Sequence, residues 1–329
     1  MAVTIRDVAR AAGVSPATVC RALTTPDRVR DTTRARVLRA ADELGYSPNR
    51  AARGLVTGRT GNLGIIVPDL ANPFFPGVVK GMQARAREAD YAVFLADTDE
   101  DPTVEADLVR VLGKQVDGIV LCSPRMSEED LRALVGETPV VLLHRRVGRI
   151  PSVTVDNLDG MRQAVAHLSA LGHRRVGYVG GPRTSWSHRE RLRGLRTATG
   201  AAGVELVEIG NVTPRFSGGV AAADLVLAAG VTAVVAYNDV VALGLLSRFR
   251  TRSVRVPAQM SVIGVDDIAM SAMVHPSLTT VALPTEQTGR AGVDLLLALL
   301  EEPDRGGATR RELDTQLMVR GSTGPAPRA

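Results

Sequence analysis

Cysteine is scarce in this sequence of 329 residues, where Cys20 and Cys122 are the only two. They lie far apart and lack the spacing of metal ligands, which argues against a disulfide framework and against a zinc site. We therefore expect two reduced thiols and no bound metal. The sequence also lacks an apolar run of the roughly 18 to 20 residues that a membrane-spanning helix needs.

Export and enzyme motifs are lacking as well. The N-terminal segment is amphipathic and carries acidic residues, unlike a signal peptide, so we expect a cytoplasmic protein without a membrane partner. No G-x-G-x-x-G follows a strand, neither G-x-x-x-x-G-K-[ST] nor G-x-S-x-G occurs, and the five histidines form no pair with metal-ligand spacing. These absences argue against a nucleotide-dependent enzyme, the rival interpretation for an alternating α/β chain, and predict no cofactor.

Positive charge is concentrated near the N-terminus. Residues 1–59 carry eleven arginines and five acidic residues, a net charge of +6, whereas the rest of the chain carries 29 basic and 30 acidic residues. A basic module joined to a nearly neutral body is typical of a protein that binds nucleic acid through one domain. The alternative is a solvated cationic face.

The segment Thr4 to Leu23 has the pattern of two helices joined by a tight turn. Apolar residues recur at helical spacing from Ile5, and Gly13 interrupts them. Ser15 is placed to cap a second helix that begins at Pro16. This arrangement predicts a helix-turn-helix, whose second helix lies in the major groove of DNA.

A third helix is expected from about Asp31 to Leu44, where apolar residues recur at helical spacing and close a small core. On the second helix, the guanidinium of Arg21 is suited to donate two hydrogen bonds to O6 and N7 of a guanine. The sequence therefore predicts a DNA-binding domain over residues 1–48.

Four further segments extend this pattern. They are VRDTTRARV (29–37), ELGYSPN (43–49), NRAARGL (49–55) and GIIVPDLANPFF (64–75). With them, the sequence resembles the lactose-repressor (LacI) family of bacterial transcription regulators over nearly its full length. The resemblance implies a homodimer that binds double-stranded operator DNA of pseudopalindromic sequence, most often as a repressor. No leucine-heptad extension follows at the C-terminus, so a dimer is expected rather than a tetramer.

The resemblance also implies which residues contact DNA. A hinge helix or linker at residues 49–60 would fold on the operator and place Leu55 as a wedge in the minor groove, the alternative being a plain linker. In the family, the residues at positions 16, 17 and 21 contact the edges of bases. Pro16 and Ala17 lack hydrogen-bonding side chains, so Arg21 is the main specificity residue. The remaining candidates for DNA contact are Thr4, Ser15, Thr18, Thr33, Asn49 and Arg53.

Beyond residue 60, apolar strands alternate with helical patterns, as in doubly wound α/β proteins. We predict an effector-binding and dimerisation domain of two similar lobes, each a doubly wound parallel sheet. The family resemblance implies that this domain is similar to the periplasmic sugar-binding proteins, which have a ligand cleft between their lobes. The predicted ranges are 61–320 for the domain, about 61–158 and 284–311 for lobe 1, about 159–283 and 312–320 for lobe 2, and 321–329 for a disordered Gly/Pro-rich tail.

The stretch GPRTSWSHRERLRG at residues 181–194 matches the family segment whose polar residues hold the effector. Arg191 falls on the ligand-binding arginine, and Ser185 and Ser187 fall on the hydroxyl-bearing loop. A planar guanidinium suits vicinal sugar hydroxyls or a carboxylate. Trp186 is the only tryptophan, and its ring either stacks on a sugar or lies at the rim or towards the dimer partner.

Other cleft candidates follow strands, where open parallel sheets bind their ligands. Asn238 and Asp266 match the family pattern, whereas Asp239 and Asp267 are expected to be helix caps or structural acceptors. Phe74 begins a helix and either stacks on a ligand or belongs to the core.

His144 stands where many family members have aspartate, and it is either a ligand partner or a satisfied buried histidine. The predicted cleft is consequently less acidic than is usual in the family. We favour a small polar effector such as a sugar, and carbohydrate-utilisation genes as the target. The alternatives are control by a purine or another metabolite as corepressor and, outside this family, a solute-binding protein.

Overall fold

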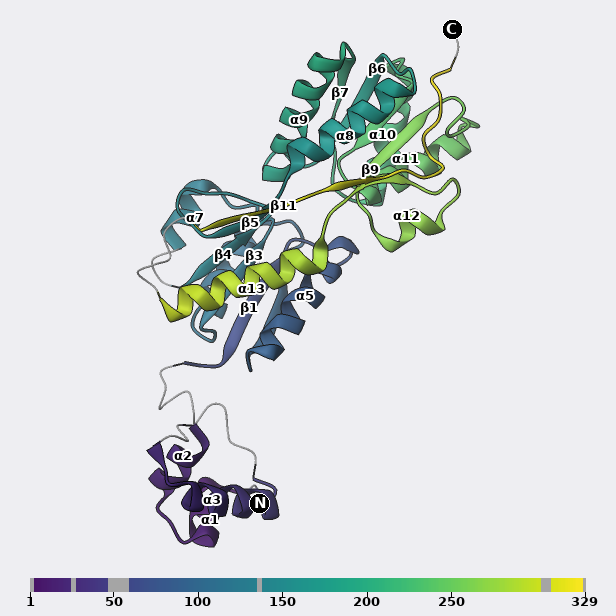
Figure 1. The fold of residues 1–329 in the computed structure, drawn as a ribbon. Helices are drawn as coiled ribbons and strands as arrows, with labels where there is room; N and C mark the ends of the chain where they lie inside the picture. The colour runs from purple at the N-terminus through teal and green to yellow at the C-terminus, as the bar shows by residue number, and fades with distance from the viewer. Residues whose placement is uncertain (1–2, 25–27, 47–58, 135–137, 303–308, 328–329) are drawn as a thin grey trace. The chain divides into compact units, whose positions relative to one another are not determined.

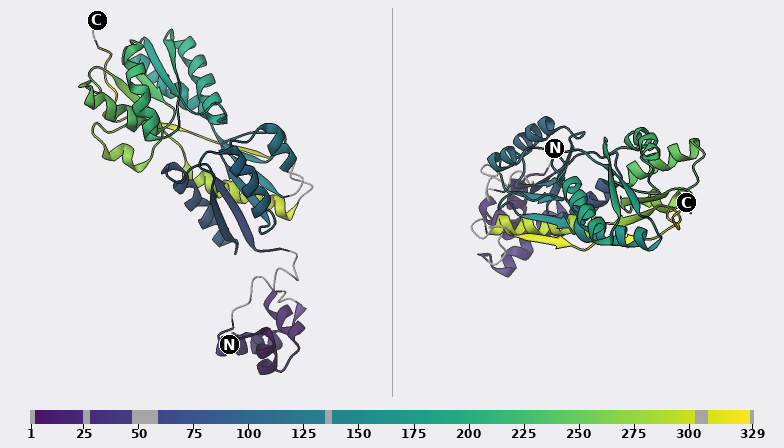
Figure 2. Two further views of the ribbon diagram at one scale, coloured as in Figure 1. Left: turned by 180° about the vertical axis from the view of Figure 1, so that it is seen from behind. Right: turned by 90° about the horizontal axis from the view of Figure 1, so that it is seen from above.

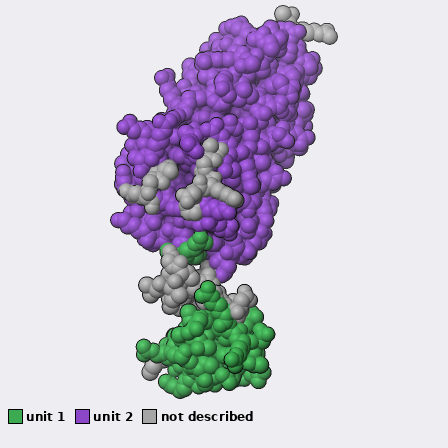
Figure 3. Space-filling view, turned by 60° about the vertical axis from the view of Figure 1, so that its left-hand side comes forward, with its two compact units in different colours: residues 1–61 green, residues 62–329 purple. Residues whose placement is uncertain are grey.

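The structure of the chain is a computed structural model that describes residues 3–24, 28–46, 59–134, 138–302 and 309–327. The chain divides into two compact units, residues 1–61 and 62–329 (Figure 3). Residues 49–58 of the expected hinge segment lie outside the described residues. None of the helices in the described ranges is long and apolar enough to cross a membrane.

The first unit is a small three-helix domain. Its helices are α1 (Ile5–Ala12), α2 (Pro16–Thr24) and α3 (Asp31–Glu43). Val8, Val19 and Val37 are fully buried between them together with several alanines, so each helix contributes one apolar stripe to the core. Helix α1 ends at Gly13, whose φ of 62° is the left-handed conformation that glycine adopts without strain. The helix-turn-helix is thereby confirmed.

The second unit consists of two lobes, each built on one sheet. The first lobe contains a parallel sheet with strand order β11-β5-β4-β3-β1-β2 (Figure 1). Its strands are β1 (Asn62–Val67), β2 (Ala92–Asp97), β3 (Gly118–Cys122), β4 (Val140–Leu143), β5 (Ser152–Val155) and β11 (Arg310–Leu313). Helices α5 (Phe74–Glu88) and α13 (Thr285–Glu301) pack on one face, and α6 (Pro102–Leu112) and α7 (Glu128–Leu134) on the other.

The second lobe repeats this architecture. Its strand order is β12-β10-β9-β8-β6-β7, and only the short β12 is antiparallel to its neighbour. The strands are β6 (Arg175–Gly180), β7 (Glu205–Asn211), β8 (Ala233–Ala236), β9 (Ser261–Asp266), β10 (Thr279–Ala282) and β12 (Gln316–Met318). Helices α8 (Asn157–Ala170) and α9 (Trp186–Ala202) cover one face, α10 (Phe216–Ala228) and α11 (Asp239–Thr251) the other, and α12 (Ala269–Met273) follows β9. The predicted two-lobed, doubly wound fold is therefore confirmed.

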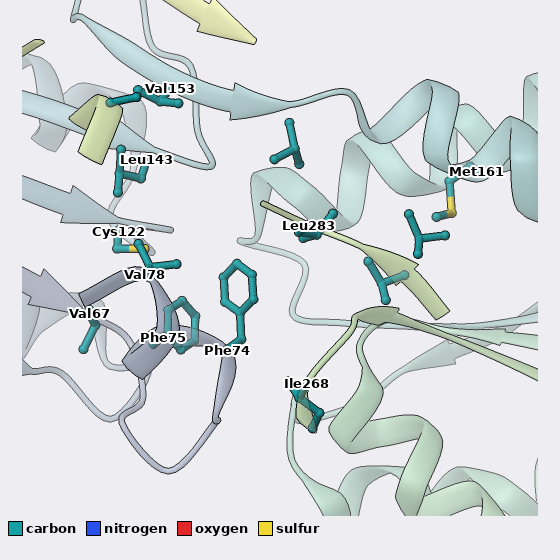
Figure 4. Close-up of a cluster of buried hydrophobic side chains, with 14 of the residues drawn as sticks. Val67, Phe74, Phe75, Val78, Cys122, Leu143, Val153, Met161, Ile268 and Leu283 are labelled. Carbon is teal, nitrogen blue, oxygen red and sulfur yellow. The ribbon is translucent and has the colours of Figure 1, made fainter. Parts of the chain in front are cut away.

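The chain passes between the lobes after β5, before α13 and after β11 (Figure 2). Strand β11 pairs with β5 as far as Leu313, so residues 312 and 313 belong to the first lobe, two residues beyond the predicted boundary. One cluster of buried apolar side chains extends across both lobes (Figure 4). Phe74 of the first lobe and Leu283 and Ile268 of the second lie in this cluster. The lobes consequently share apolar contacts beside the cleft.

The C-terminal segment differs from the predicted disorder, because residues 321–327 are described and pack on the second lobe. The hydroxyl of Ser322 is buried, donates to the Val262 carbonyl oxygen at 2.6 Å and accepts from the Thr279 N–H at 2.8 Å. The Ala326 N–H donates to the Leu171 carbonyl oxygen. Glycine and proline composition indicated a flexible tail, but strands β9 and β10 supply partners for its polar groups.

Candidate functional site

The exposed start of α2 carries most of the side chains predicted to contact bases. Ser15, Pro16 and Ala17 are exposed, and so is Arg21, one turn further along the helix. The Arg21 Nε donates to the Ala17 carbonyl oxygen at 3.3 Å, which directs the guanidinium back along this exposed face. The Ser15 hydroxyl accepts from the Thr18 N–H at 3.2 Å and is hydrogen-bonded to the Thr18 hydroxyl at 2.9 Å. Ser15 thus has a structural role as the helix cap.

The other predicted DNA contacts lie on α1, α3 and the hinge segment. The Thr4 hydroxyl and backbone N–H both donate to the Asp7 carboxylate, at 2.7 and 3.0 Å, which stabilises the start of α1. Thr33 is half-buried in the first turn of α3. The predicted hinge contacts, Asn49, Arg53 and Leu55, lie outside the described residues and stay predictions.

A small cavity lies between the two lobes at the carboxyl ends of their strands. Its volume is about 20 Å³, so the lobes are closed upon it. A sugar-sized ligand needs several hundred Å³, so its binding requires the lobes to separate further. Six of the eight predicted effector residues line this cavity: Phe74, His144, Ser187, Arg191, Asn238 and Asp266.

Arg191 and Asp266 form the charged floor of the cavity, and both are buried. The Arg191 Nη2 lies 3.8 Å from Asp266 Oδ1, and its Nε donates to Asn157 Oδ1 at 3.1 Å. Arg191 also donates to the Tyr237 carbonyl oxygen and lies 5.1 Å from the centre of the Tyr237 ring. Burial raises the pKa of Asp266 well above its usual range, although the Arg191 charge opposes this effect. Four different groups therefore hold the guanidinium in place.

Asp239 lies behind this floor and is fully buried. Its carboxylate accepts from the Thr280 hydroxyl at 2.6 Å, the Ser271 hydroxyl at 2.7 Å and the Ile268 N–H at 3.0 Å. Burial raises its pKa to about 6. The expectation that Asp239 is a structural acceptor is confirmed. Asp267 likewise accepts from Arg320 at 2.6 Å.

His144 follows β4 in the left-handed region, with a φ of 55°. Its Nε2 is buried and finds no hydrogen-bond partner among the described residues, while its ring meets the Phe74 ring edge-on at 5.2 Å. Burial, with a smaller effect of the Arg191 charge, lowers the pKa of His144 to about 3. His144 therefore presents a neutral, unsatisfied imidazole nitrogen to the cavity.

This buried imidazole makes stability dependent on pH. The unfolded chain protonates His144 near pH 6.5, whereas the folded chain does not until about pH 3, so stability is lost as pH falls below about 6.5. We expect a loss of about 2 kcal/mol from His144 between pH 7.5 and pH 5. The test is His144→Asn, because asparagine also tolerates a positive φ. Chemical unfolding of this variant at pH 7.5 and pH 5 should show a smaller change in the free energy of unfolding than in the parent protein. An identical change in both proteins would contradict this assignment.

Two of the predicted effector residues, Ser185 and Trp186, do not line the interlobe cavity. The buried Ser185 hydroxyl caps α9, accepting from the His188 N–H at 3.2 Å, and is hydrogen-bonded to the Tyr237 hydroxyl at 3.0 Å. Trp186 lines a separate groove of about 490 Å³ between α8, α9 and β11. There its ring lies 5.9 Å from the guanidinium carbon of Arg146, on the opposite lobe. The rim placement considered for Trp186 is the better description.

The cavity also contains residues that the sequence analysis missed. Arg125 is buried, donates to both carboxylate oxygens of Glu100 at 2.5 and 2.9 Å, and donates to the Ser123 carbonyl oxygen at 2.8 Å. Tyr237 immediately precedes Asn238 and forms part of the wall. The rule that ligands bind beyond the carboxyl ends of strands, applied also to β2 and β3, would have pointed to Glu100, Ser123 and Arg125.

The described residues contain no group of three His, Cys, Asp or Glu side chains that is able to hold a metal ion. The charges of the cavity are instead arranged in pairs, with Arg125 beside Glu100 and Arg191 beside Asp266. Such a site presents donors and acceptors without a strong excess of either charge. This arrangement suits a polar ligand of low net charge.

Comparisons with known proteins agree with this architecture. The family model described as "Bacterial regulatory proteins, lacI family" matches residues 4–49, and the model described as "Periplasmic binding protein-like domain" matches residues 165–323. The chain is 33% identical to the HTH-type transcriptional regulator DegA of Bacillus subtilis (strain 168), over 99% of both chains. It is 34% identical to the HTH-type transcriptional repressor CytR of Escherichia coli (strain K12), over 99% of this chain and 98% of that one.

Solved structures show the same similarity. The lac repressor dimer bound to operator and the anti-inducer ONPF has a TM-score of 0.87 and 28% identity, covering 98% of this chain and 100% of that one. A complex of the transcriptional regulator CelR with cellobiose has a TM-score of 0.72 and 33% identity, covering 97% and 99%. A helix-turn-helix head, a two-lobed core and full-length relatives thus lead to one conclusion. The chain belongs to the lacI family of bacterial regulatory proteins and is a DNA-binding transcriptional regulator.

Proposed function

We propose that the chain is a repressor of carbohydrate-utilisation genes that binds a pseudopalindromic operator as a homodimer and is controlled by a sugar or a similar small polar effector. The main observation behind the proposal is the cavity between the lobes, which occurs in a chain whose N-terminal domain is a helix-turn-helix. Effector binding changes lobe closure and thereby the spacing of the two heads in the dimer. A ligand shifts that equilibrium only by its different affinity for the two closures.

The chemistry of the cavity supports a sugar as the effector. The imidazole of His144, the guanidinium of Arg191 and the carboxyl of Asp266 offer donors and acceptors to several hydroxyl groups. Phe74, Ser187 and Asn238 complete the proposed binding set. The related CelR structure holds cellobiose, and a lacI-family regulator from Enterococcus faecium, 25% identical, holds ribose.

Exposed apolar side chains on the second unit support a homodimer. Strand β2 forms an edge of its sheet and exposes Phe94 and Leu95, while Leu225 on α10 and Met273 on α12 are also exposed. Apolar side chains exposed on an edge strand and on helices favour burial against another chain. The lac repressor structure that resembles this chain is itself a dimer on its operator.

The proposed role of Arg21 leads to a test on DNA. We expect Arg21→Ala to weaken operator binding by about 1 to 3 kcal/mol and to relax the preference at one base pair, because a bidentate contact to guanine is lost. Fluorescence anisotropy with the operator, its single-base variants and random DNA measures both effects. An equal loss on operator and random DNA would assign Arg21 to phosphate contact instead. The fold of the head should not change, because Arg21 is exposed.

The effector proposal is tested by titrating the purified protein with sugars, sugar phosphates, nucleosides and purines. The emission of Trp186 and the thermal midpoint are followed together. Trp186 lies beside Arg146 of the opposite lobe, so its emission reports lobe movement without requiring ligand contact. A sugar that shifts both signals and releases operator supports the proposal. A purine that shifts both and tightens operator binding would replace it with control by a corepressor.

A further inference from the structure

One arginine bridges the two lobes at the edge of the cavity. Arg215 immediately precedes α10 of the second lobe, and its Nε donates to Asp69 Oδ2 of the first lobe at 3.1 Å. Its Nη2 pairs with Asp99, also of the first lobe. Each of the three residues has a neighbour in the cavity wall, since Pro214, Glu100 and Asn72 all line it. The bridge therefore lies at the edge of the cavity, outside its wall.

One carboxylate of this bridge, that of Asp69, is held in place by its own loop, and the backbone of the other two residues is hydrogen-bonded. The other oxygen of the Asp69 carboxylate accepts from the Ala71 N–H at 2.8 Å, and Asp69 is 5% exposed. The Asp99 N–H donates to an oxygen of Asp97 at 2.8 Å. The Arg215 carbonyl oxygen accepts from the Gly218 N–H in the first turn of α10. The pair of Arg215 with the buried Asp69 carboxylate therefore loses less side-chain entropy than a pair between mobile side chains, whereas Asp99, whose side chain is 81% exposed, is the weaker partner.

Two other polar contacts join the lobes near the cavity, and both are weaker than the Arg215 bridge. The Ser187 hydroxyl donates to the His144 carbonyl oxygen at 3.4 Å, at the long end of hydrogen-bond distances. The Arg146 guanidinium lies 5.9 Å from the centre of the Trp186 ring, near the limit of a cation–π contact. Arg215 is distinct because it joins two carboxylates of one lobe to the backbone start of a helix in the other.

We propose that Arg215, Asp69 and Asp99 form an ion-pair latch that holds the lobes closed when no effector is bound. The latch regulates access to the effector site, so the inference rests on the proposed function. Opening separates the guanidinium from both carboxylates, and effector capture competes with their reassociation. Closure is consequently sensitive to ionic strength, because salt screens partly exposed ion pairs. The latch residues influence effector affinity without contacting the effector.

The population of open molecules is measurable without any ligand. We suggest a reporter protein with Cys20→Ser, Cys122→Ala and Ser123→Cys, because Ser123 lines the cavity and is buried. Its labelling rate with a small thiol reagent is proportional to the open fraction when opening and closing are fast. The full-length protein is used without DNA. We expect Arg215→Ala to raise this rate about three- to tenfold, since two ion pairs are lost.

Matched variants separate the latch from a general loss of stability. Arg252→Ala removes a guanidinium of similar exposure that pairs with Asp224 inside the second lobe, and it should leave the labelling rate unchanged. Asp69→Asn retains an oxygen for the Ala71 N–H, loses the charge and should raise the rate. Salt at 1 M should raise the rate of the reporter protein but not that of its Arg215→Ala variant.

Unchanged labelling in Arg215→Ala, or an equal rise in Arg252→Ala, would overturn the latch. Either result would leave the proposed effector site untouched, because no effector is present in the measurement. The opposite outcome is also distinguishable. If labelling is faster in Arg215→Ala but no compound shifts Trp186 emission, the latch is supported and the tested classes of effector are excluded.

Discussion

Arg191→Met is expected to lower the free energy of unfolding by about 3 to 5 kcal/mol, because it leaves the buried Asp266 without its positive partner. The loss should grow with pH. The Arg191 charge opposes the larger effect of burial on the pKa of Asp266, so its removal raises that pKa further, and the folded variant keeps a proton over a range of pH in which the folded parent protein has released it. The difference in stability between the two proteins therefore grows as pH rises through that range.

Unfolding by guanidinium chloride at pH 5.5 and at pH 8 measures the free energy of unfolding and its dependence on pH. The matched control is Arg196→Met, which removes an exposed partner of Glu208 from the same helix and should change stability by about 0.5 kcal/mol or less. If Arg191→Met were no less stable than Arg196→Met at pH 8, the floor of the cavity would not hold a buried ion pair.

Gly289→Ala is expected to destabilise the first lobe by about 1 to 3 kcal/mol, whereas Gly200→Ala should stabilise the chain by about 0.5 to 1 kcal/mol. Helices α5 and α13 cross closely at Gly289, where an added Cβ would lie 2.2 Å from the Val78 carbonyl oxygen and 2.8 Å from the Met82 nitrogen. The helices must then separate. At Gly200, in α9, an added Cβ meets nothing within 4 Å, so only the gain in helix propensity remains.

The pair of substitutions is informative because the chemical change is the same at both positions. Chemical unfolding followed by circular dichroism, with thermal midpoints beside it, gives the sign of each change. Equal effects at the two positions would show that α5 and α13 are not in backbone contact. Operator binding by the head should be unaffected in Gly200→Ala, since α9 belongs to the second unit.

Much of the fold was predictable because its signals are local. Gly13 ends α1 and Ser15 caps α2 through bonds between near neighbours in the chain. The alternation of apolar strands with helices predicted both sheets, since central strands such as β3 and β9 are buried on two faces. The carboxyl ends of strands, located in this way, correctly grouped Asn238 and Asp266 with Arg191 around one cavity.

The errors arose where a partner lies far away in the sequence. The tail at residues 321–327 has a composition typical of disorder, but Ser322 finds acceptors and donors in β9 and β10. Trp186 is adjacent to the cavity residue Ser187, yet successive residues at a helix start point in different directions, and Trp186 faces Arg146. Of the two alternatives that the sequence left open for Trp186, this geometry favours the rim over stacking on a ligand in the interlobe cavity.

By itself, the sequence determined the helix-turn-helix head, the alternating strands and helices, and the polar residues at strand ends, because each depends on periodicity or on neighbours within a few positions. Only the tertiary structure decided how the lobes meet. Three features depend on how the folded sheets bring together loops that are distant in the sequence: the Arg125–Glu100 pair, the His144 nitrogen that has no partner among the described residues, and the bridge from Arg215 to Asp69. The Arg215 bridge joins residues 146 positions apart, a separation at which no local preference acts.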